Sequence, residues 1–289
     1  MKIRRHFLRP GSILLLLLLI IAPALRAQSG QRSKPAKALN ANKVRVLFLG
    51  NSFTYFNNLP QIIVRMSELG SAQKPIDAEM VTVGGATLKS LWEGGKALDA
   101  LKRGKWDYVV LQEQSTLGRA ATAGGVPQIN DPQTFHEYAR RFNSEIKKAG
   151  AKTVFYLTWA RQDAPQTQAA LTNAYLSIAK ELHAIIAPVG IAWESALNTK
   201  PQLALHIEDK SHPTPMGSYL AACVLYATIY GKSPEGLPSQ ITGIQIDHTG
   251  RIITGQDENK GQAELVNVNA EDAAMLQKIA WQTVKQQRK

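Results

Sequence analysis

The chain has 289 residues, of which 44% are hydrophobic and 19% charged, so it can bury a sizeable core. This composition excludes wholesale disorder and a collagen-like repeat. Its net charge is +12, but five basic residues and no acidic ones lie in the first 27 residues, which leaves +7 for the rest. No basic block interleaved with aromatic residues occurs, so we expect no nucleic-acid partner. The single cysteine, Cys223, excludes an internal disulfide and a cysteine-based zinc site.

The first 27 residues have the layout of a secretory signal peptide. A basic segment, 1–9, precedes an unbroken aliphatic run, 13–21, and small residues follow up to Ala27. The run is shorter than the about 20 apolar residues that span a bilayer. We predict a signal peptide over 1–27, cleaved after Ala27 or Ala24, and export to the periplasm or medium without further membrane contact. The general secretory and twin-arginine routes both stay open.

Segment 28–42 is polar and has no apolar period, which predicts a flexible leader before a folded domain over 43–289. In that domain, apolar runs of strand length alternate with helical patterns. The expected strands are 44–49, 78–83, 108–111, 153–157 and 189–193. The expected helices cover 59–69, 88–98, 135–149, 168–187 and 216–230.

The alternation of strands and helices predicts an α/β fold. Strands that are near-continuous apolar runs are buried on both faces, so the sheet is expected to be parallel, with helices on both sides. We therefore predict a three-layer α/β/α sandwich with a five-stranded parallel, flavodoxin-like sheet. Ligands bind beyond the carboxyl ends of such strands, which directs attention to the residues that follow each run.

From about residue 232 the pattern changes into a C-terminal extension, in which Pro234, Gly236 and Pro238 break the helix. We expect a short hairpin over 241–254 and a closing helix over 270–286 that Asn269 caps. The long loop 116–131 is the expected lid or specificity element. The functional role of the extension stays open.

A serine follows the first expected strand, in the turn Gly50–Asn51–Ser52. Serine is a weak nucleophile unless a base contacts it and a third group orients that base. The segment from Asp209 to His212 holds a carboxylate and an imidazole within one turn. Each motif alone is also an ordinary turn. Together they predict a triad with Ser52 as nucleophile, His212 as base and Asp209 as the orienting carboxylate.

These residues resemble the SGNH or GDSL family of serine esterases and lipases, over most of 44–231. The turn at Ser52 is similar to the first conserved block of that family, with Asn51 where many members carry aspartate, and the segment from Asp209 to His212 is similar to the last block. The turn with Gly84 and Gly85 resembles the second block, whose glycine N–H binds the oxyanion. The resemblance implies this role for Gly85.

The third block departs from the G-x-N-D pattern of the family, because Gln112, Glu113 and Gln114 follow the third strand. A glutamine amide has the same donor chemistry as asparagine. The resemblance therefore implies an oxyanion hole formed by Ser52, Gly85 and either Gln112 or Gln114, with Gln112 as the first choice. We interpret Glu113 as a charged residue of the loop without a role in the oxyanion hole.

The segments L-Q-x-x-S and T-W-A are similar to a GNSF subgroup of the family, which implies that Asn51 and Trp159 lie at the pocket. The implied activity is that of an exported serine esterase acting on small O-acyl esters, such as acetyl groups on carbohydrate, without cofactor or metal. A non-catalytic carbohydrate-binding protein with the same fold is the alternative. A metal-dependent phosphoesterase that uses Asp209 and His212 as ligands is a further alternative.

The remaining histidines and Cys223 have no motif around them that predicts chemistry. Surface or structural roles are expected for the histidines, and a core position for Cys223. These histidines are His136, His183, His206 and His248.

Overall fold

The computed structural model describes residues 42–70, 72–118, 121–123, 126–253 and 263–288. The predicted signal peptide and almost all of the predicted leader lie outside these residues. The described residues form one compact unit. None of the helices in the described ranges combines the length and the apolar character that a membrane span needs.

Five parallel strands form the central sheet, so the predicted fold class is confirmed. They are β1 (Val44–Gly50), β2 (Ile76–Thr82), β3 (Tyr108–Leu111), β6 (Lys152–Tyr156) and β7 (Ile185–Ala187). Their order, β2-β1-β3-β6-β7, is the flavodoxin-like order. Successive side chains of a strand face opposite sides, so Phe48 of β1 joins one hydrophobic cluster and Leu49 joins the other. The chain runs outward from β1 in both directions, which places the ligand-binding crevice at its carboxyl end.

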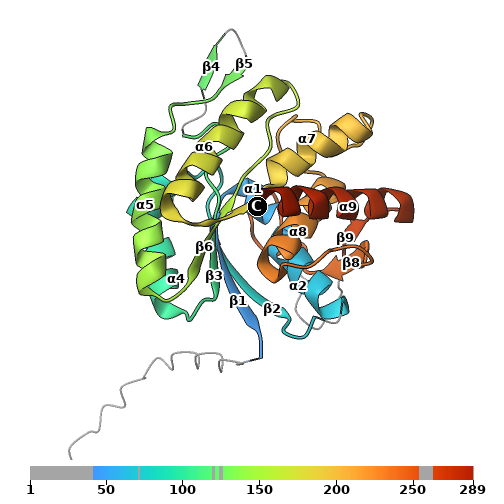
Figure 1. Ribbon diagram of the computed structural model, residues 1–289, viewed down its shortest axis with the longest axis horizontal. Helices are drawn as coiled ribbons and strands as arrows, with labels where there is room; N and C mark the ends of the chain where they lie inside the picture. The colour runs from blue at the N-terminus through green and yellow to red at the C-terminus, as the bar shows by residue number, and fades with distance from the viewer. Residues whose placement is uncertain (1–41, 71, 119–120, 124–125, 254–262, 289) are drawn as a thin grey trace, which may run out of the picture. The chain divides into compact units, whose positions relative to one another are not determined.

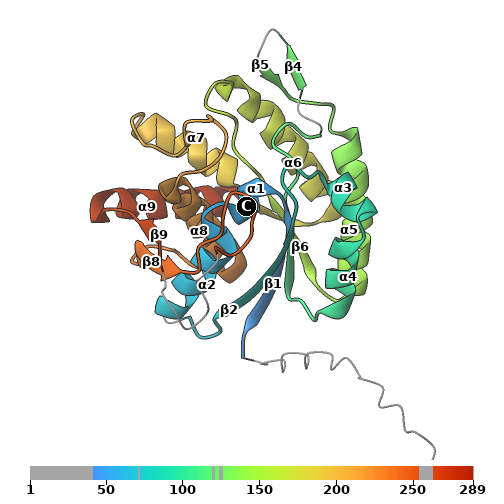
Figure 2. The ribbon, with the colours of Figure 1, turned by 180° about the vertical axis from the view of Figure 1, so that it is seen from behind.

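Helices cover both faces of the sheet (Figures 1 and 2). One layer holds α2 (Leu59–Leu69), α7 (Val189–Thr199), α8 (Pro215–Tyr230) and α9 (Ala270–Gln287). The other holds α3 (Leu88–Glu93), α4 (Lys96–Arg103), α5 (Gln133–Lys148) and α6 (Gln168–Leu182). Helix α8 is buried along almost its whole length because α2 and α9 both pack against it, and it places Cys223 in the core as predicted.

The fifth strand lies earlier in the chain than predicted. The expected strand at 189–193 is the start of α7, and β7 is formed by Ile185–Ala187 instead. The preceding helix stops at Leu182 because His183 takes a left-handed backbone conformation, with φ of 50°. The apolar residues on both sides of Pro188 form one continuous run, and periodicity does not separate a short buried strand from a buried helix in such a run.

The C-terminal extension contains β8 (Gln240–Gly243), which pairs antiparallel with β9 (Ala263–Asn267) rather than with an adjacent strand. The predicted hairpin is present only as a single bridge between Ile246 and Ile252. Helix α9 begins as predicted, because the Asn269 side chain accepts a hydrogen bond from the Asp272 N–H. Within the expected lid, β4 (Ala121–Ala123) and β5 (Val126–Gln128) form a small antiparallel pair.

Candidate active site

Ser52 lies at the carboxyl end of β1, where the short helix α1 (Ser52–Tyr55) begins. Asn51 caps this helix, because its Oδ1 accepts a hydrogen bond of 3.1 Å from the Phe53 N–H. The turn is tight: a Cβ at Gly50 would lie 2.5 Å from the Gln112 side chain. Glycine is therefore needed here, and the close packing fixes the backbone that carries the serine.

Ser52, His212 and Asp209 lie in contact, although 160 residues separate the serine from the histidine. The distance from Ser52 Oγ to His212 Nε2 is 2.8 Å. The other ring nitrogen, Nδ1, is hydrogen-bonded to Asp209 Oδ2. This arrangement leaves Nε2 facing the hydroxyl as a proton acceptor.

The turn from Asp209 to His212 is held by its own hydrogen bonds. Asp209 Oδ1 accepts bonds of 2.9 Å from the backbone N–H groups of Ser211 and His212. Partial burial acts to raise the pKa of Asp209, but the bonds from His212 and the backbone outweigh it and lower the pKa below its ordinary value. Asp209 is therefore a carboxylate at neutral pH and can stabilise a protonated imidazole.

Aromatic side chains enclose the imidazole of His212. Phe56 stacks on it with ring centres 4.2 Å apart, and Phe53 meets it edge-on at 5.6 Å. Trp159 is fully buried behind Phe53 and donates a hydrogen bond of 3.0 Å to the Ser211 carbonyl. Trp159, a possible pocket residue from the sequence, does not itself line the cavity; it lies behind Phe53 and supports the Asp209–His212 turn from the core. Phe56 was missed because no sequence pattern marks a residue that contacts a distant histidine.

A cavity of about 380 Å³ opens in front of the serine. Its lining comes from the ends of β1, β2 and β3, from the Asp209–His212 turn and from the C-terminal extension. The lining residues are Asn51, Ser52, Phe53, Tyr55, Phe56, Gly84, Gly85, Gln114, Ser115, Asp209, Ser211, His212 and His248.

Gly85 lies at the wall of this cavity with a positive φ of 67°, a conformation that glycine adopts without strain. The turn is fixed from behind, because the Asn51 side chain donates a hydrogen bond of 2.9 Å to the Ala86 carbonyl. Asn51 thus lines the cavity and also joins the first two loops of the site.

Gln112 does not lie at the cavity. It is fully buried, and its Nε2 donates to Asn51 Oδ1 at 3.0 Å and to the Glu113 carbonyl at 2.7 Å. Its Oε1 accepts from the Asn51 N–H and from the Thr54 hydroxyl, each at 2.9 Å. Both amide hydrogens are engaged, so Gln112 does not serve as the oxyanion donor. Its hydrogen bonds join the loop at Asn51 to the loop that follows β3.

Gln114 is the glutamine that faces the cavity. Its Oε1 accepts a hydrogen bond of 2.6 Å from the Thr116 hydroxyl. This contact orients the amide, and no acceptor for its Nε2 is recorded in the part of the chain that the structure describes. Of the two alternatives left by the sequence, Gln114 lines the cavity and Gln112 does not.

Glu113 is buried, with 1% of its surface exposed, and is not a loop charge. Its carboxylate accepts hydrogen bonds from the N–H of Leu88 at 2.9 Å and from the N–H of Gln114 at 2.8 Å. Burial raises its pKa to about 7, and the two backbone bonds only partly offset this effect. The carboxylate therefore joins the start of α3, which follows Gly85, to the backbone of Gln114.

The C-terminal extension completes one wall of the cavity. The Tyr55 hydroxyl donates a hydrogen bond of 2.9 Å to the carbonyl of His248, and the Asn58 side chain donates one of 2.8 Å to the Ile244 carbonyl. His248 lines the cavity, a position that sequence analysis did not predict for any residue beyond 232. Within the described ranges, no three His, Cys, Asp or Glu side chains gather into a group suited to a metal ion.

Comparison with known proteins relates the fold of this chain to that of solved structures. No protein-family model and no curated protein sequence matches the chain. Among solved structures, a candidate SGNH hydrolase from Slackia heliotrinireducens is similar to it, with 26% identity and a TM-score of 0.51 over 65% of this chain and 99% of the other. This similarity supports the SGNH hydrolase superfamily for this chain.

Two more distant structures share the SGNH fold of this chain. A DUF4886 family protein from Bacteroides uniformis has 15% identity and a TM-score of 0.56 over 86% of this chain and 96% of the other. A mutant of an acetyl-xylooligosaccharide esterase from Geobacillus has 15% identity and a TM-score of 0.54 over 65% and 94%. The fold of this SGNH protein is thus that of hydrolases and esterases.

Proposed function

We propose that this SGNH protein is an exported serine esterase that hydrolyses small O-acyl esters. The observation that carries the proposal is the 2.8 Å contact between Ser52 Oγ and His212 Nε2, with Asp209 on the opposite ring nitrogen. A serine, a base and an orienting carboxylate in this arrangement are the requirements for acyl transfer.

In the first step Ser52 Oγ attacks the ester carbonyl carbon, and the hydroxyl proton moves to His212 Nε2. Asp209 stabilises the imidazolium that forms. The negative oxygen of the tetrahedral intermediate accepts hydrogen bonds from the N–H groups of Ser52 and Gly85 and from Gln114 Nε2. Donors of this kind contribute about 3 to 4 kcal/mol each to transition-state stabilisation.

Collapse of the intermediate breaks the bond to the alcohol, which leaves with the proton from His212. A water molecule then attacks the acyl-enzyme while His212 accepts its proton, and the acid is released as Ser52 regains its hydrogen. Because Gln114 takes the place of the usual asparagine, the changed third block is compatible with turnover.

The proposed substrates are esters with short acyl groups, such as acetate, on a small molecule or a carbohydrate. Two features support this class: the modest volume of the cavity, about 380 Å³, and the fold shared with an acetyl-xylooligosaccharide esterase. The signal-peptide pattern of residues 1–27 supports export.

Hydrolysis of 4-nitrophenyl acetate tests the proposal. We expect Ser52→Ala and His212→Ala each to lower kcat by about a thousandfold or more, as removal of triad members does in other enzymes. Ser177→Ala, which changes an exposed serine on α6, is the matched control and keeps full activity. Full activity in Ser52→Ala would contradict the proposal.

The two alternative functions give different results in the same assays. A folded wild-type protein without any hydrolysis would favour the non-catalytic carbohydrate-binding protein. Loss of activity in EDTA, with hydrolysis of 4-nitrophenyl phosphate, would favour the metal-dependent phosphoesterase.

A further inference from the structure

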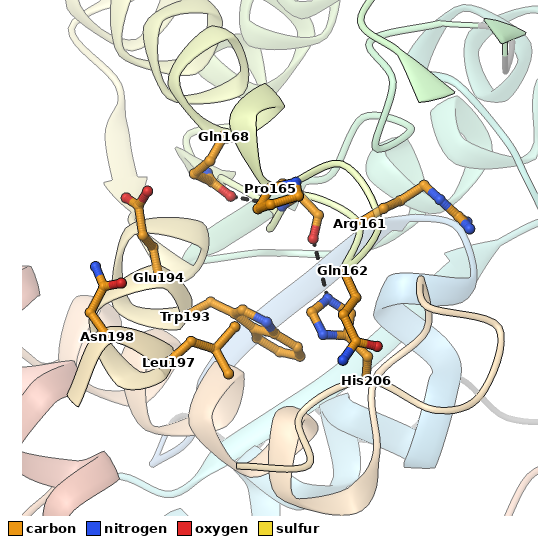
Figure 3. A pocket seen from close by; sticks show the side chains of 10 residues that line it. Arg161, Gln162, Pro165, Gln168, Trp193, Glu194, Leu197, Asn198 and His206 are labelled. Carbon is orange, nitrogen blue, oxygen red and sulfur yellow. Dashed lines mark hydrogen bonds between the residues drawn. The ribbon is translucent and has the colours of Figure 1, made fainter. Parts of the chain in front are cut away.

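A second cavity, of about 170 Å³, lies between α7 and the loop that carries Arg161, Gln162 and Pro165 (Figure 3). It has no lining residue in common with the catalytic cavity. Its walls are the loop 160–165, the start of α6 and one side of α7. The lining residues are Ala160, Arg161, Gln162, Pro165, Gln168, Trp193, Glu194, Leu197, Asn198 and His206.

Trp193 at the wall of this cavity has a buried indole N–H without a hydrogen-bond partner among the described residues. Only 2% of its surface is exposed. The indole N–H groups of Trp106 and Trp159 both donate to backbone carbonyls, at 3.1 and 3.0 Å. Buried indoles normally find an acceptor, and an unpaired donor next to a cavity indicates an acceptor that the protein itself does not supply.

Other polar groups at the wall are already engaged. Gln168 bonds to the backbone of Ala160 and Thr158, and His206 Nε2 contacts the Ala160 carbonyl at 3.2 Å. The guanidinium of Arg161 bonds to Asp163 and to the Asp209 carbonyl, and in Figure 3 it extends away from Trp193. The wall therefore offers no uncommitted cation, and an anionic ligand is disfavoured.

The groups left for a ligand are two amides and one carboxylate. Asn198 and Glu194 lie one helical turn apart on α7, and Gln162 lies across the cavity on the loop. Their side chains have no hydrogen-bond or ion-pair partner among the described residues. Amides both donate and accept, and the carboxylate accepts from hydroxyl groups. Leu197 and Pro165 add apolar surface to the lining of the cavity.

We propose that this cavity is a second binding site, and that its ligand is a neutral sugar residue. A sugar hydroxyl oxygen can accept from the Trp193 N–H, and its hydroxyl hydrogens can donate to Glu194 and the amides. The C–H face of the ring packs on Leu197 and Pro165. The site is independent of the esterase reaction, because none of its residues contacts Ser52 Oγ or the atoms of the oxyanion hole.

NMR titration of the ¹⁵N-labelled protein tests the site directly, because the chain has only five tryptophans. The probes are methyl β-D-xylopyranoside and methyl β-D-glucopyranoside. We expect one indole N–H signal to shift and saturate with at least one probe, and that signal to be absent in Trp193→Phe. The shift should persist in Ser52→Ala, which separates this site from the catalytic cavity.

Asn198→Ala provides a second variant in case Trp193→Phe does not fold. Loss of one hydrogen bond to the ligand should weaken binding by about five- to tenfold. Thr199→Ala, an exposed change on the same helix outside the cavity, should leave binding unchanged. The proposal is overturned if neither sugar shifts an indole signal, if the shifting signal remains in Trp193→Phe, or if Ser52→Ala abolishes the shift.

Discussion

The buried carboxylate of Glu113 gives the sharpest prediction about the oxyanion hole. Glu113→Gln keeps the shape of the side chain but leaves one acceptor oxygen for the two backbone N–H groups of Leu88 and Gln114. An unpaired buried N–H costs about 1 to 3 kcal/mol. The start of α3 and the backbone of Gln114 can then shift relative to each other, and the oxyanion donors lose their alignment.

The expected effect is on the chemical step. Complete loss of one oxyanion donor lowers kcat by about 10²- to 10³-fold, and misalignment costs less. We therefore expect Glu113→Gln to lower kcat for 4-nitrophenyl acetate by about ten- to a hundredfold, with KM changed by less than about twofold, because the donors act mainly in the transition state. Glu137→Gln, an exposed change on α5, is the control that keeps wild-type kinetics.

The wild type and Glu113→Gln should also differ in how their stability depends on pH, because only the wild type carries the titrating carboxyl group. Burial raises the pKa of Glu113 from 4.5 to about 7, which corresponds to about 3 kcal/mol. Between pH 4.5 and pH 7 the carboxyl group of Glu113 is protonated in the folded protein and ionised in the unfolded chain. The contribution of Glu113 to the free energy of unfolding is therefore fully present below pH 4.5 and is lost as the pH rises through 7.

Urea unfolding at several pH values measures this contribution. The wild type should lose about 3 kcal/mol relative to Glu113→Gln between pH 4.5 and pH 8. Parallel stability profiles for the two proteins, or an unchanged kcat in Glu113→Gln, would refute the reasoning about the buried carboxylate.

Three further predictions concern the catalytic cavity. Asp209→Asn should fold normally and lower kcat by about 10²- to 10⁴-fold, because the amide no longer holds the imidazole of His212 in the required tautomer. Circular dichroism checks the fold and the nitrophenyl acetate assay checks kcat; a near-normal kcat would count against the triad. Gln114→Ala should lower kcat by about 10²-fold while Gln114→Asn recovers part of it, and equal activity of wild type and Gln114→Ala would exclude Gln114 as a donor. Tyr55→Phe removes the bond to the His248 carbonyl and should raise KM by about three- to tenfold with kcat nearly constant, so a selective loss of kcat would show that the extension does not shape the binding wall.

Much of the fold could be predicted because β1 and β3, which carry part of the site, are near-continuous apolar runs. Polar residues flank the apolar runs that form β1 and β3 on both sides, so the sequence indicates where these two strands begin and end. The run around Pro188 is apolar on both sides, and there the prediction placed the fifth strand in what is α7. The ends of elements in such runs are decided by tertiary packing and not by local pattern.

The serine, histidine and aspartate could be predicted because each chemical role needs a particular residue type in a short motif. The roles of the third block could not. Gln112 is engaged by Asn51, 61 residues away, and Gln114 faces the cavity, a difference that depends on how two loops pack. The burial of Glu113 and the approach of His248 to the cavity depend on long-range contacts in the same way.

Labelling with a fluorophosphonate probe tests the proposed nucleophile most directly. Intact-mass spectrometry of the wild-type protein should show one phosphonyl adduct, and peptide mapping should place it on Ser52, with labelling nearly abolished in His212→Ala. A folded protein that takes up no adduct, or that carries the adduct on another residue, would contradict the assignment of Ser52 and His212 as nucleophile and base.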